Sequence, residues 1–253
     1  MRELNIYPLW RRRDQPVSLE LEQSAHVSPV DEKISSAHTD VTISPTVAAL
    51  EPSAETAIVN EPLEPASEVS NLSWTELKQT VRICTACKLR AGCTQTVFGV
   101  GDEKADWLFV GEGPGADEDA LGEPFVGQAG ILLDNMLTAI KLKRGKNVYI
   151  ANVVKCRPPD NRNPASDEIA QCLPYLHRQI ALIQPKLIVA LGKTAATALL
   201  GKEATLGSLR GALHDYHGIP LIVTYHPAYL LRSPLEKSKV WQDLCLAVKI
   251  MEN

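Results

Sequence analysis

The stretch KLIVALG at residues 186–192 decides the fold, because five consecutive apolar residues stand between a lysine and a glycine. An apolar run of this length, without polar alternation, is typical of a strand buried on both faces of a sheet. The following residues 193–200 (KTAATALL) have the apolar spacing of a helix. A buried strand that leads directly into a helix is the unit from which parallel sheets are built.

The same unit recurs on both sides of this stretch. Further buried strands are predicted at residues 106–111 (DWLFVG), 147–154 (NVYIANVV) and 220–225 (PLIVTY). Helical spacing covers residues 73–83, 128–141, 166–182 and 235–251. Ser73 and Ser166 are the predicted N-caps of two of these helices. The sequence therefore predicts an α/β fold of three layers, α/β/α, around a central four-stranded, mainly parallel sheet, with its ligand site beyond the carboxyl ends of the strands.

Composition divides the 253 residues into three regions. Residues 14–71 hold six prolines, no glycine and no aromatic residue, and such a segment buries too little apolar surface to offset the entropy of ordering. We expect a disordered acidic linker there and a folded domain at residues 72–253. Residues 1–13 include LNIYPLWRRR, an apolar cluster followed by three arginines, which is a candidate docking peptide for a protein partner or for the domain itself.

The net charge of −4 belongs to the linker and not to the domain. Residues 14–71 carry eleven acidic side chains against one basic, whereas residues 72–253 carry 21 basic against 18 acidic. A mildly positive domain is compatible with binding a phosphate backbone. No apolar run approaches the roughly 18 residues needed to span a bilayer, and no secretory signal is apparent. We expect a cytoplasmic monomer without a membrane contact.

Four of the six cysteines are regularly spaced, in the pattern C-x2-C-x68-C-x15-C. Since the cytosol keeps thiols reduced, such cysteines are better read as metal or cluster ligands than as disulfides. Four thiolates suit a tetrahedral zinc or a [4Fe–4S] cluster, and the spacing does not decide between them. Cys93 is an alternative ligand because it lies close to Cys87 in the sequence. Cys245 falls in the apolar register of the last predicted helix, so we expect it in the core.

A glycine-rich turn, GEGPG at residues 111–115, follows the first predicted strand. Gly111 and Gly113 let the backbone approach a small ligand there, and Glu112 is expected to project into the pocket. The turn also satisfies the dinucleotide pattern G-x-G-x-x-A on paper. Acidic residues at 117–119 would, however, stand where a pyrophosphate binds, so we reject that interpretation.

Three more side chains mark the same edge of the sheet. Asn152, toward the end of the second strand, offers a donor and an acceptor side by side, the set that pairs with N3–H and O4 of a pyrimidine. Phe125 lies in a glycine-flanked loop, where stacking is a more natural role than core packing. His226 ends the fourth strand, and Pro227 restricts the backbone after it.

These motifs together resemble the family 4 uracil-DNA glycosylases, the iron–sulfur-containing family within the uracil-DNA glycosylase superfamily. The resemblance covers roughly residues 74–251 and rests on the spaced cysteines and on GEGPG (111–115), EPFVGQAG (123–130), NVVKCRPP (152–159) and HPAYLLR (226–232). It implies a structural [4Fe–4S] cluster, with the ligands Cys84, Cys87, Cys156 and Cys172.

The resemblance also implies the activity. Enzymes of this family hydrolyse the N-glycosidic bond of deoxyuridine in single- or double-stranded DNA, release uracil and leave an abasic site, which initiates base excision repair; no metal takes part in the chemical step. A base inside a duplex cannot be reached, so the nucleotide must be flipped into a pocket. Uracil leaves as an anion from an oxocarbenium-like sugar, so a neutral donor aimed at its O2 stabilises charge that exists only as the bond breaks.

By this resemblance, Phe125 would stack on the flipped uracil, Asn152 would pair with its edge and His226 would donate to O2. The backbone of Gly111 and Gly113 would help to hold the base. The two remaining roles fall to carboxylates. Glu112 would position the attacking water, although an aspartate base used by some relatives is absent from this turn, and Glu118 would exclude the methyl group of thymine.

The resemblance places the DNA contacts around residues 226–232. Leu230 or Leu231, beside Arg232, would wedge into the stack that the flipped base has left. No basic cluster follows GEGPG, so phosphate contacts must come from scattered cations, for which the candidates are Lys155, Arg157, Arg162, Lys193, Arg210 and Arg232.

Two other classes of function remain open on the sequence alone. One is a superfamily member that acts on another deaminated base, hypoxanthine or xanthine, or that binds uracil-containing DNA covalently. Covalent binders carry an additional basic, histidine-containing loop, and no such insertion precedes HPAYLLR. The other is a non-enzymatic iron–sulfur protein that binds damaged DNA or transfers electrons.

Overall fold

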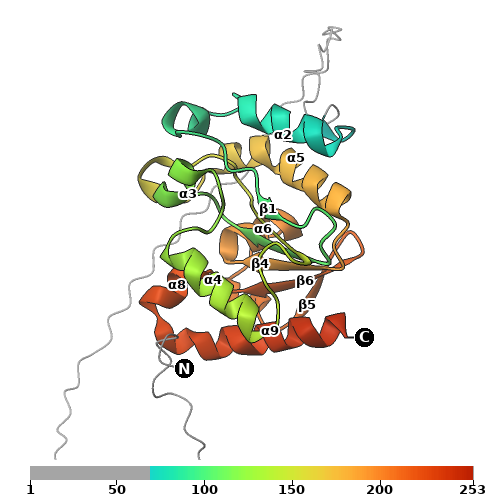
Figure 1. Cartoon of the computed structure of the whole chain (residues 1–253). Helices are drawn as coiled ribbons and strands as arrows, with labels where there is room; N and C mark the ends of the chain where they lie inside the picture. The colour runs from blue at the N-terminus through green and yellow to red at the C-terminus, as the bar shows by residue number, and fades with distance from the viewer. Residues whose placement is uncertain (1–68, 253) are drawn as a thin grey trace, which may run out of the picture. The chain divides into compact units, whose positions relative to one another are not determined.

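A computed structural model describes residues 69–252 of the chain (Figure 1). The predicted docking peptide at residues 1–13 and residues 14–68 of the predicted linker lie outside the described residues. The last residues of that linker are described, and Val69 is buried against the core. Packing therefore includes residues before the expected boundary at 72. No helix within residues 69–252 has the length and apolar character needed to cross a membrane.

The predicted strands form the parallel centre of one sheet. They are β2 (Trp107–Gly111), β3 (Val148–Asn152), β4 (Leu187–Leu191) and β6 (Ile219–Thr224). Strand β2 pairs in parallel with both β3 and β4, and β4 pairs in parallel with β6. The α/β prediction and the parallel centre of the sheet are thus confirmed.

Within residues 69–252 the sheet has six strands instead of four, in the order β1-β3-β2-β4-β6-β5. The added edge strands, β1 (Val100–Gly101) and β5 (Leu213–Tyr216), are antiparallel to their neighbours. Neither has the apolar run that marks the central strands: β1 is two residues long, and β5 has the sequence LHDY, of which only Tyr216 is buried. The hydrophobic pattern therefore gave no signal for either.

Helices cover both faces of the sheet, as the three-layer prediction requires. One apolar cluster includes residues of α2 (Trp74–Ile83), α5 (Ser166–Ile183) and α6 (Lys193–Leu200). The other includes residues of α4 (Gln128–Ala139), α8 (Pro227–Arg232) and α9 (Lys237–Met251). Figure 1 shows α2 and α5 across the sheet from α4 and α9. Successive strand residues alternate between the clusters, as the pleat demands.

Shorter helices fill the connections and were not predicted. They are the α-helices α3 (Ala116–Leu121) and α7 (Leu206–Leu209) and the 3₁₀ helices η1 (Lys88–Gly92), η2 (Pro159–Asn161) and η3 (Pro234–Glu236). Helix α8 was not predicted either. All are six residues long or less, which is too short for helical periodicity to be recognised in the sequence.

One of the two predicted N-caps is correct. Ser73 caps α2, where its backbone N–H donates to Glu76 at 2.8 Å. Ser166 is wrong as a cap, because it is the first residue of α5 and Ala165 precedes the helix. Glu168 reaches back in place of a capping hydroxyl and accepts a hydrogen bond from the Ala165 N–H at 2.7 Å. A carboxylate at this third helical position can satisfy one of the free backbone donors of the first turn.

The strand order creates a crevice between β2 and β4. The chain leaves β2 toward α4 on one face of the sheet and leaves β4 toward α6 on the other face. At such a switch point the connections diverge and leave space beyond the carboxyl ends of the strands. The register of the strands brings their ends together at this crevice, since Gly111 at the end of β2 pairs with Asn152 at the end of β3.

Candidate functional site

A cleft of about 780 Å³ opens at the carboxyl ends of the central strands. Its wall includes most of the residues that the sequence singled out: Glu112, Gly113, Glu118, Phe125, Asn152, His226 and Arg232. These residues come from separate strand ends and loops that the parallel sheet brings together. The predicted convergence on one edge of the sheet is therefore what the structure shows.

Asn152 places an unpaired acceptor in this cleft. Its side chain is buried, with 2% of the residue exposed, and Oδ1 has no hydrogen-bond partner among the described residues. A buried polar atom without a partner costs about 1–3 kcal/mol, so Oδ1 is suited to a ligand that brings a donor. Gly111 makes the room, because a Cβ there would lie 2.5 Å from Asn152 Oδ1 and 2.5 Å from the Phe125 ring.

Phe125 is held in an unusual backbone conformation beside Asn152. Its φ is +56°, in the left-handed region that a bulky residue rarely adopts. Its ring is buried among core residues and also lines the cleft, where it stacks with the His226 imidazole at a centroid distance of 5.4 Å. Arg144 fixes the backbone by donating to the carbonyl oxygens of Pro124 at 2.8 Å and Phe125 at 2.7 Å.

Glu118 holds the other side of this loop. Its Oε1 accepts hydrogen bonds from the N–H groups of Val126 and Gly127 at 3.0 and 3.2 Å, and its Oε2 accepts one from Gly115 at 3.0 Å. The carboxylate therefore ties the start of α3 to the loop that carries Phe125. Glu118 lies in the cleft wall, where the sequence placed it, but it also has this supporting role, which the sequence did not reveal.

His226 is a neutral hydrogen-bond donor at neutral pH. Burial, with a contribution from the nearby positive charge of Arg232, lowers the pKa of His226 from 6.5 to about 4. Its Nδ1 lies 3.2 Å from the Ala228 N–H and accepts its hydrogen bond, because His226 caps the start of α8. The single proton of the neutral ring must then be on Nε2. The side chain consequently offers an N–H to the cleft without carrying a full charge.

Glu112 is half-buried in the cleft wall, and Thr194 supports it. The Thr194 hydroxyl donates a short hydrogen bond to Glu112 Oε2, and the Glu112 carbonyl accepts one from the Val154 N–H at 3.1 Å. Thr194 belongs to α6, directly after β4. The sequence did not indicate this residue as part of the site, and its place directly after a buried strand is the signal that marks it.

The structure corrects one predicted apolar DNA contact and two predicted cations, because all three side chains are turned inward. Leu230 is wrong as a wedge, because α8 turns it into the core, where it is 1% exposed. Leu231, on the outer face of the same helix, is 45% exposed. Arg210 is also turned inward and pairs with the buried Asp243 carboxylate at 2.7 Å. Arg232 remains exposed in the cleft wall.

Lys155 is fully buried and cannot contact DNA. Its Nζ donates to the Asn152 carbonyl oxygen at 2.8 Å and to Gln179 Oε1 at 2.6 Å. Burial lowers the pKa of this ammonium to about 8. Lys155 thus braces the backbone of Asn152 against α5, one residue before Cys156.

The four spaced cysteines line a second cavity, on the α2 and α5 side of the sheet. The cysteines are Cys84, Cys87, Cys156 and Cys172. Tyr175 and Lys155 line the same cavity. Two of the sulfurs accept hydrogen bonds, Cys84 from the Tyr175 hydroxyl at 3.2 Å and Cys172 from the Lys155 N–H at 3.2 Å. Burial raises the pKa of Cys172 to about 11.

The two remaining cysteines are not in the wall of that cavity. Cys93 is buried beside Cys156, with which it shares a hydrogen bond, so it remains next to the spaced cysteines. Cys245 is exposed, so the expectation that it belongs to the core is wrong. No group of three or more His, Cys, Asp or Glu residues within 69–252 converges closely enough to hold a single metal ion. The spaced cysteines therefore surround a cavity without meeting at one point.

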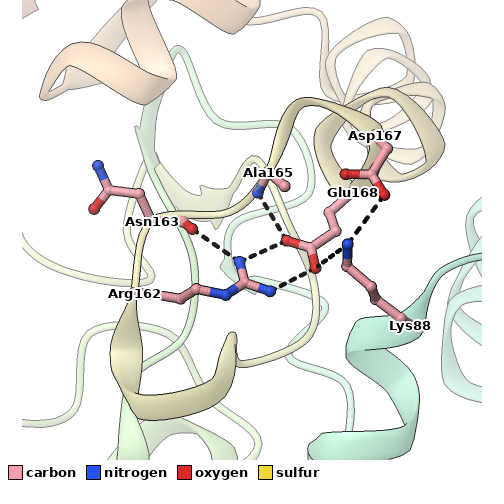
Figure 2. A network of polar contacts seen from close by, with 6 residues as sticks. All are labelled: Lys88, Arg162, Asn163, Ala165, Asp167 and Glu168. Atoms are coloured by element: carbon pink, nitrogen blue, oxygen red, sulfur yellow. Dashed lines mark hydrogen bonds and ion pairs between the residues drawn. The ribbon is translucent and has the colours of Figure 1, made fainter.

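The buried carboxylate of Glu168 links Lys88, which follows Cys87, to Arg162 in the cleft wall (Figure 2). Glu168 has a side chain with no exposed surface and accepts two hydrogen bonds from the Arg162 guanidinium, at 2.7 and 2.8 Å. Lys88, the residue after Cys87, lies 3.7 Å from the same carboxylate. Arg162 holds the pKa of Glu168 at about 2. Because Arg162 and its neighbour Asn163 line the cleft, this network fixes part of its wall.

Comparison with known proteins agrees with this geometry. Residues 98–245 match the model of the uracil DNA glycosylase superfamily. The chain belongs to that superfamily. Type-4 uracil-DNA glycosylases from Thermotoga maritima and Pyrobaculum aerophilum are 46% and 41% identical to it, over 62% and 68% of this chain and 82% and 91% of theirs. The type-4 uracil-DNA glycosylase of Archaeoglobus fulgidus is 42% identical, over 68% of this chain and 89% of its own. The family resemblance read from the sequence is confirmed.

Gly130 tests the support of the Phe125 loop in this superfamily member. A Cβ at Gly130 would overlap the Phe125 carbonyl group, so Gly130→Ala must displace that backbone. We expect the substitution to lower the free energy of unfolding by about 1–3 kcal/mol, measured by urea denaturation. Gly207→Ala is the control, because nothing lies within 4 Å of a Cβ at that position. Equal stability of the two variants would contradict the proposed contact.

The titration of His226 tests its environment. We expect NMR to give a pKa of about 4, and Arg232→Ala to raise that pKa because a repelling positive charge is lost. Lys193→Ala removes another cation from the cleft wall and should leave the pKa unchanged. Between pH 6.5 and 4 the unfolded chain binds a proton at His226 that the folded chain does not, so His226 makes the fold less stable as the pH falls through that window. A pKa near 6.5 in the wild-type protein would refute the burial argument.

Proposed function

We propose that this protein is a uracil-DNA glycosylase, which hydrolyses the N-glycosidic bond of a flipped-out deoxyuridine and leaves an abasic site for base excision repair. The observation that carries the proposal is the unpaired, buried Asn152 Oδ1 beside an aromatic ring and a neutral histidine. The related type-4 enzymes bear the same activity in their names. The substrate is uracil-containing DNA, single- or double-stranded.

Base recognition follows from the donors and acceptors in the cleft. Uracil presents an N3–H donor next to the O4 acceptor, and the Asn152 amide presents the complementary pair. Its Oδ1 has no partner among the described residues, so binding N3–H removes a desolvation cost instead of breaking an existing hydrogen bond. Phe125 provides the apolar surface on which the ring stacks.

Bond cleavage needs a group that responds to charge on the leaving base. As the glycosidic bond breaks, the bonding electrons pass to uracil and its O2 becomes more negative. An Nε2–H of neutral His226 directed at O2 gains strength at that moment, and it is already oriented by the hydrogen bond at Nδ1. Glu112, held by Thr194, positions the water that adds to the sugar carbon. The proton that this water then loses neutralises the departing uracil anion, so the products are uracil and the abasic sugar.

Glu118 is proposed to exclude thymine. Three backbone N–H groups hold its carboxylate, so the side chain cannot move aside without breaking the loop that carries Phe125. A methyl group at C5 that met this carboxylate would desolvate it without offering a hydrogen bond. Rejection by a fixed polar group is a form of specificity that a purely apolar pocket achieves poorly.

A [4Fe–4S] cluster held by Cys84, Cys87, Cys156 and Cys172 is proposed for the second cavity. In such a cluster each cysteine binds a different iron, which agrees with sulfurs that surround a cavity without converging on one point. Hydrogen bonds to Cys84 and Cys172 are of the kind that tune cluster ligands. The cluster would be structural: it would join α2, α5 and the segment after β3, and the reaction would not pass through it.

The remaining proposals concern the cellular compartment, the oligomeric state and the contacts with DNA. We propose a cytoplasmic monomer, since a reducing compartment suits cysteines that bind a cluster. DNA phosphates would meet the exposed Arg232 and Lys193, with Leu231 as the apolar wedge. The docking role of residues 1–13 remains a proposal from composition alone.

An excision assay tests the activity. Oligonucleotides that contain uracil, thymine or hypoxanthine are incubated with the protein, and abasic products are cleaved with alkali. We expect cleavage at uracil alone, and Asn152→Ala and His226→Ala should each lower the rate at least about tenfold, the effect of losing about 1.4 kcal/mol from the transition state. Gln242→Ala, exposed on α9, is the control. Wild-type rates in the Asn152 and His226 variants would remove these residues from the mechanism, and cleavage at hypoxanthine would change the substrate assignment.

Metal analysis tests the cluster. The purified protein should be brown and contain iron and acid-labile sulfide in equal amounts, whereas Cys172→Ala should lose both together with thermal stability. Cys245→Ser changes an exposed cysteine outside the cavity and should keep the cluster. A colourless protein that contains stoichiometric zinc would refute the assignment.

A further inference from the structure

Two tyrosines in the cleft wall have no part in the proposed chemistry. Tyr225 and Tyr229 flank His226 in the sequence, and both line the cleft. Their ring centroids are 5.0 Å apart and their planes are inclined by 37°. The uracil contacts proposed above come from Phe125, Asn152 and His226, so this pair lines the same cleft without a contact to uracil assigned to it.

Tyr225, the less exposed ring of the pair, is held in place by Arg210. The Arg210 guanidinium lies 4.3 Å from the centroid of the Tyr225 ring. Asp243 accepts hydrogen bonds from Arg210 at 2.7 and 2.9 Å and from the Thr224 hydroxyl at 2.6 Å. Since Asp243 and Thr224 are buried, Arg210 cannot swing out toward DNA. Arg210 therefore holds the Tyr225 ring in place, and the Tyr229 ring lies against Tyr225 at an inclination of 37°.

The outer ring is accessible. Tyr229 is 36% exposed, although its neighbour Leu230 in α8 is buried. An aromatic ring that is supported from below and open to a cleft is a suitable surface for a nucleobase, because every base has a π face and stacks without regard to sequence. The exposed Arg232 lies in the same wall, where it can neutralise a phosphate.

We propose that Tyr229 is a stacking platform for the base next to the flipped uridine, with Tyr225 and Arg210 as its support. This subsite rests on the proposed glycosylase function, because it needs a DNA strand whose uridine occupies the pocket beside His226. It would bind an unpaired neighbour base of any identity. The contact would thus be available in single-stranded DNA, where the neighbour is free to leave its own stack.

Removing the neighbour base from the DNA tests the proposal. Single-stranded oligonucleotides carry uridine with normal neighbours, or with a tetrahydrofuran abasic analogue on the 5′ or the 3′ side. We expect kcat/KM of the wild-type protein to fall about tenfold for the analogue on one side, as one stacked base is worth on the order of tenfold or more. Tyr229→Ala should lower kcat/KM on DNA with normal neighbours about tenfold. The abasic analogue should not lower kcat/KM of this variant further. Tyr229→Phe keeps the ring and should keep the dependence on the neighbour.

Controls separate this subsite from the fold and from the function. Leu235→Ala removes an exposed apolar side chain on η3, outside the cleft lining, and should retain wild-type rates and the full dependence on the neighbour. Binding of the same oligonucleotides with 2′-fluorodeoxyuridine, measured by fluorescence anisotropy, reports the stacking contact without the reaction. No uracil excision by the wild-type protein would refute the glycosylase function, whereas excision that ignores both neighbours, or Tyr229→Ala retaining the dependence, would refute the stacking platform.

Discussion

The in-register pairing of the parallel central strands is the constraint on which the site depends. Gly111 is paired with Asn152 and Leu191 with Thr224, so the chain leaves each strand at the same edge of the sheet. Glu112, Asn152, Thr194 and His226 meet there, although they are spread over more than a hundred positions in the sequence. A shift of one residue in any strand would turn its side chains to the opposite face and dismantle the cleft.

Hydrogen-bonded charged side chains hold the segments around the sheet edge in place. Arg162 with Glu168, Arg210 with Asp243 and the ammonium of Lys155 each fix a segment next to the cleft. Isolated buried ion pairs often contribute little net stability, because desolvation cancels the attraction. Their value here is geometric: each holds a loop or a strand end in one place. Lys155 and Arg210 are thereby unavailable to DNA, which explains why counting the basic residues of the domain was a poor guide to its nucleic-acid surface.

Much of the fold was predictable because the spacing of apolar residues along the sequence differs between buried strands and helices. Uninterrupted apolar runs identified the central strands, and their alternation with helices gave the layers. The edge strands had no such pattern, and the Glu168 cap needed the true start of α5, which the serine at 166 obscured. For the site, strand ends and motifs located Asn152, Phe125 and His226. Burial of Leu230 and the inward turn of Arg210 depend on how α8 and α9 pack, which no local pattern contains.

The left-handed backbone at Phe125 limits how this pocket can be altered. Only glycine, asparagine and a few other residues adopt that conformation readily, while β-branched residues are strongly disfavoured. Replacing the ring by valine or isoleucine to reshape the pocket would therefore strain the main chain as well as remove the stacking surface. A protein engineer who seeks a different base preference has more freedom at a cleft residue with ordinary helical backbone, such as Ala129 in α4.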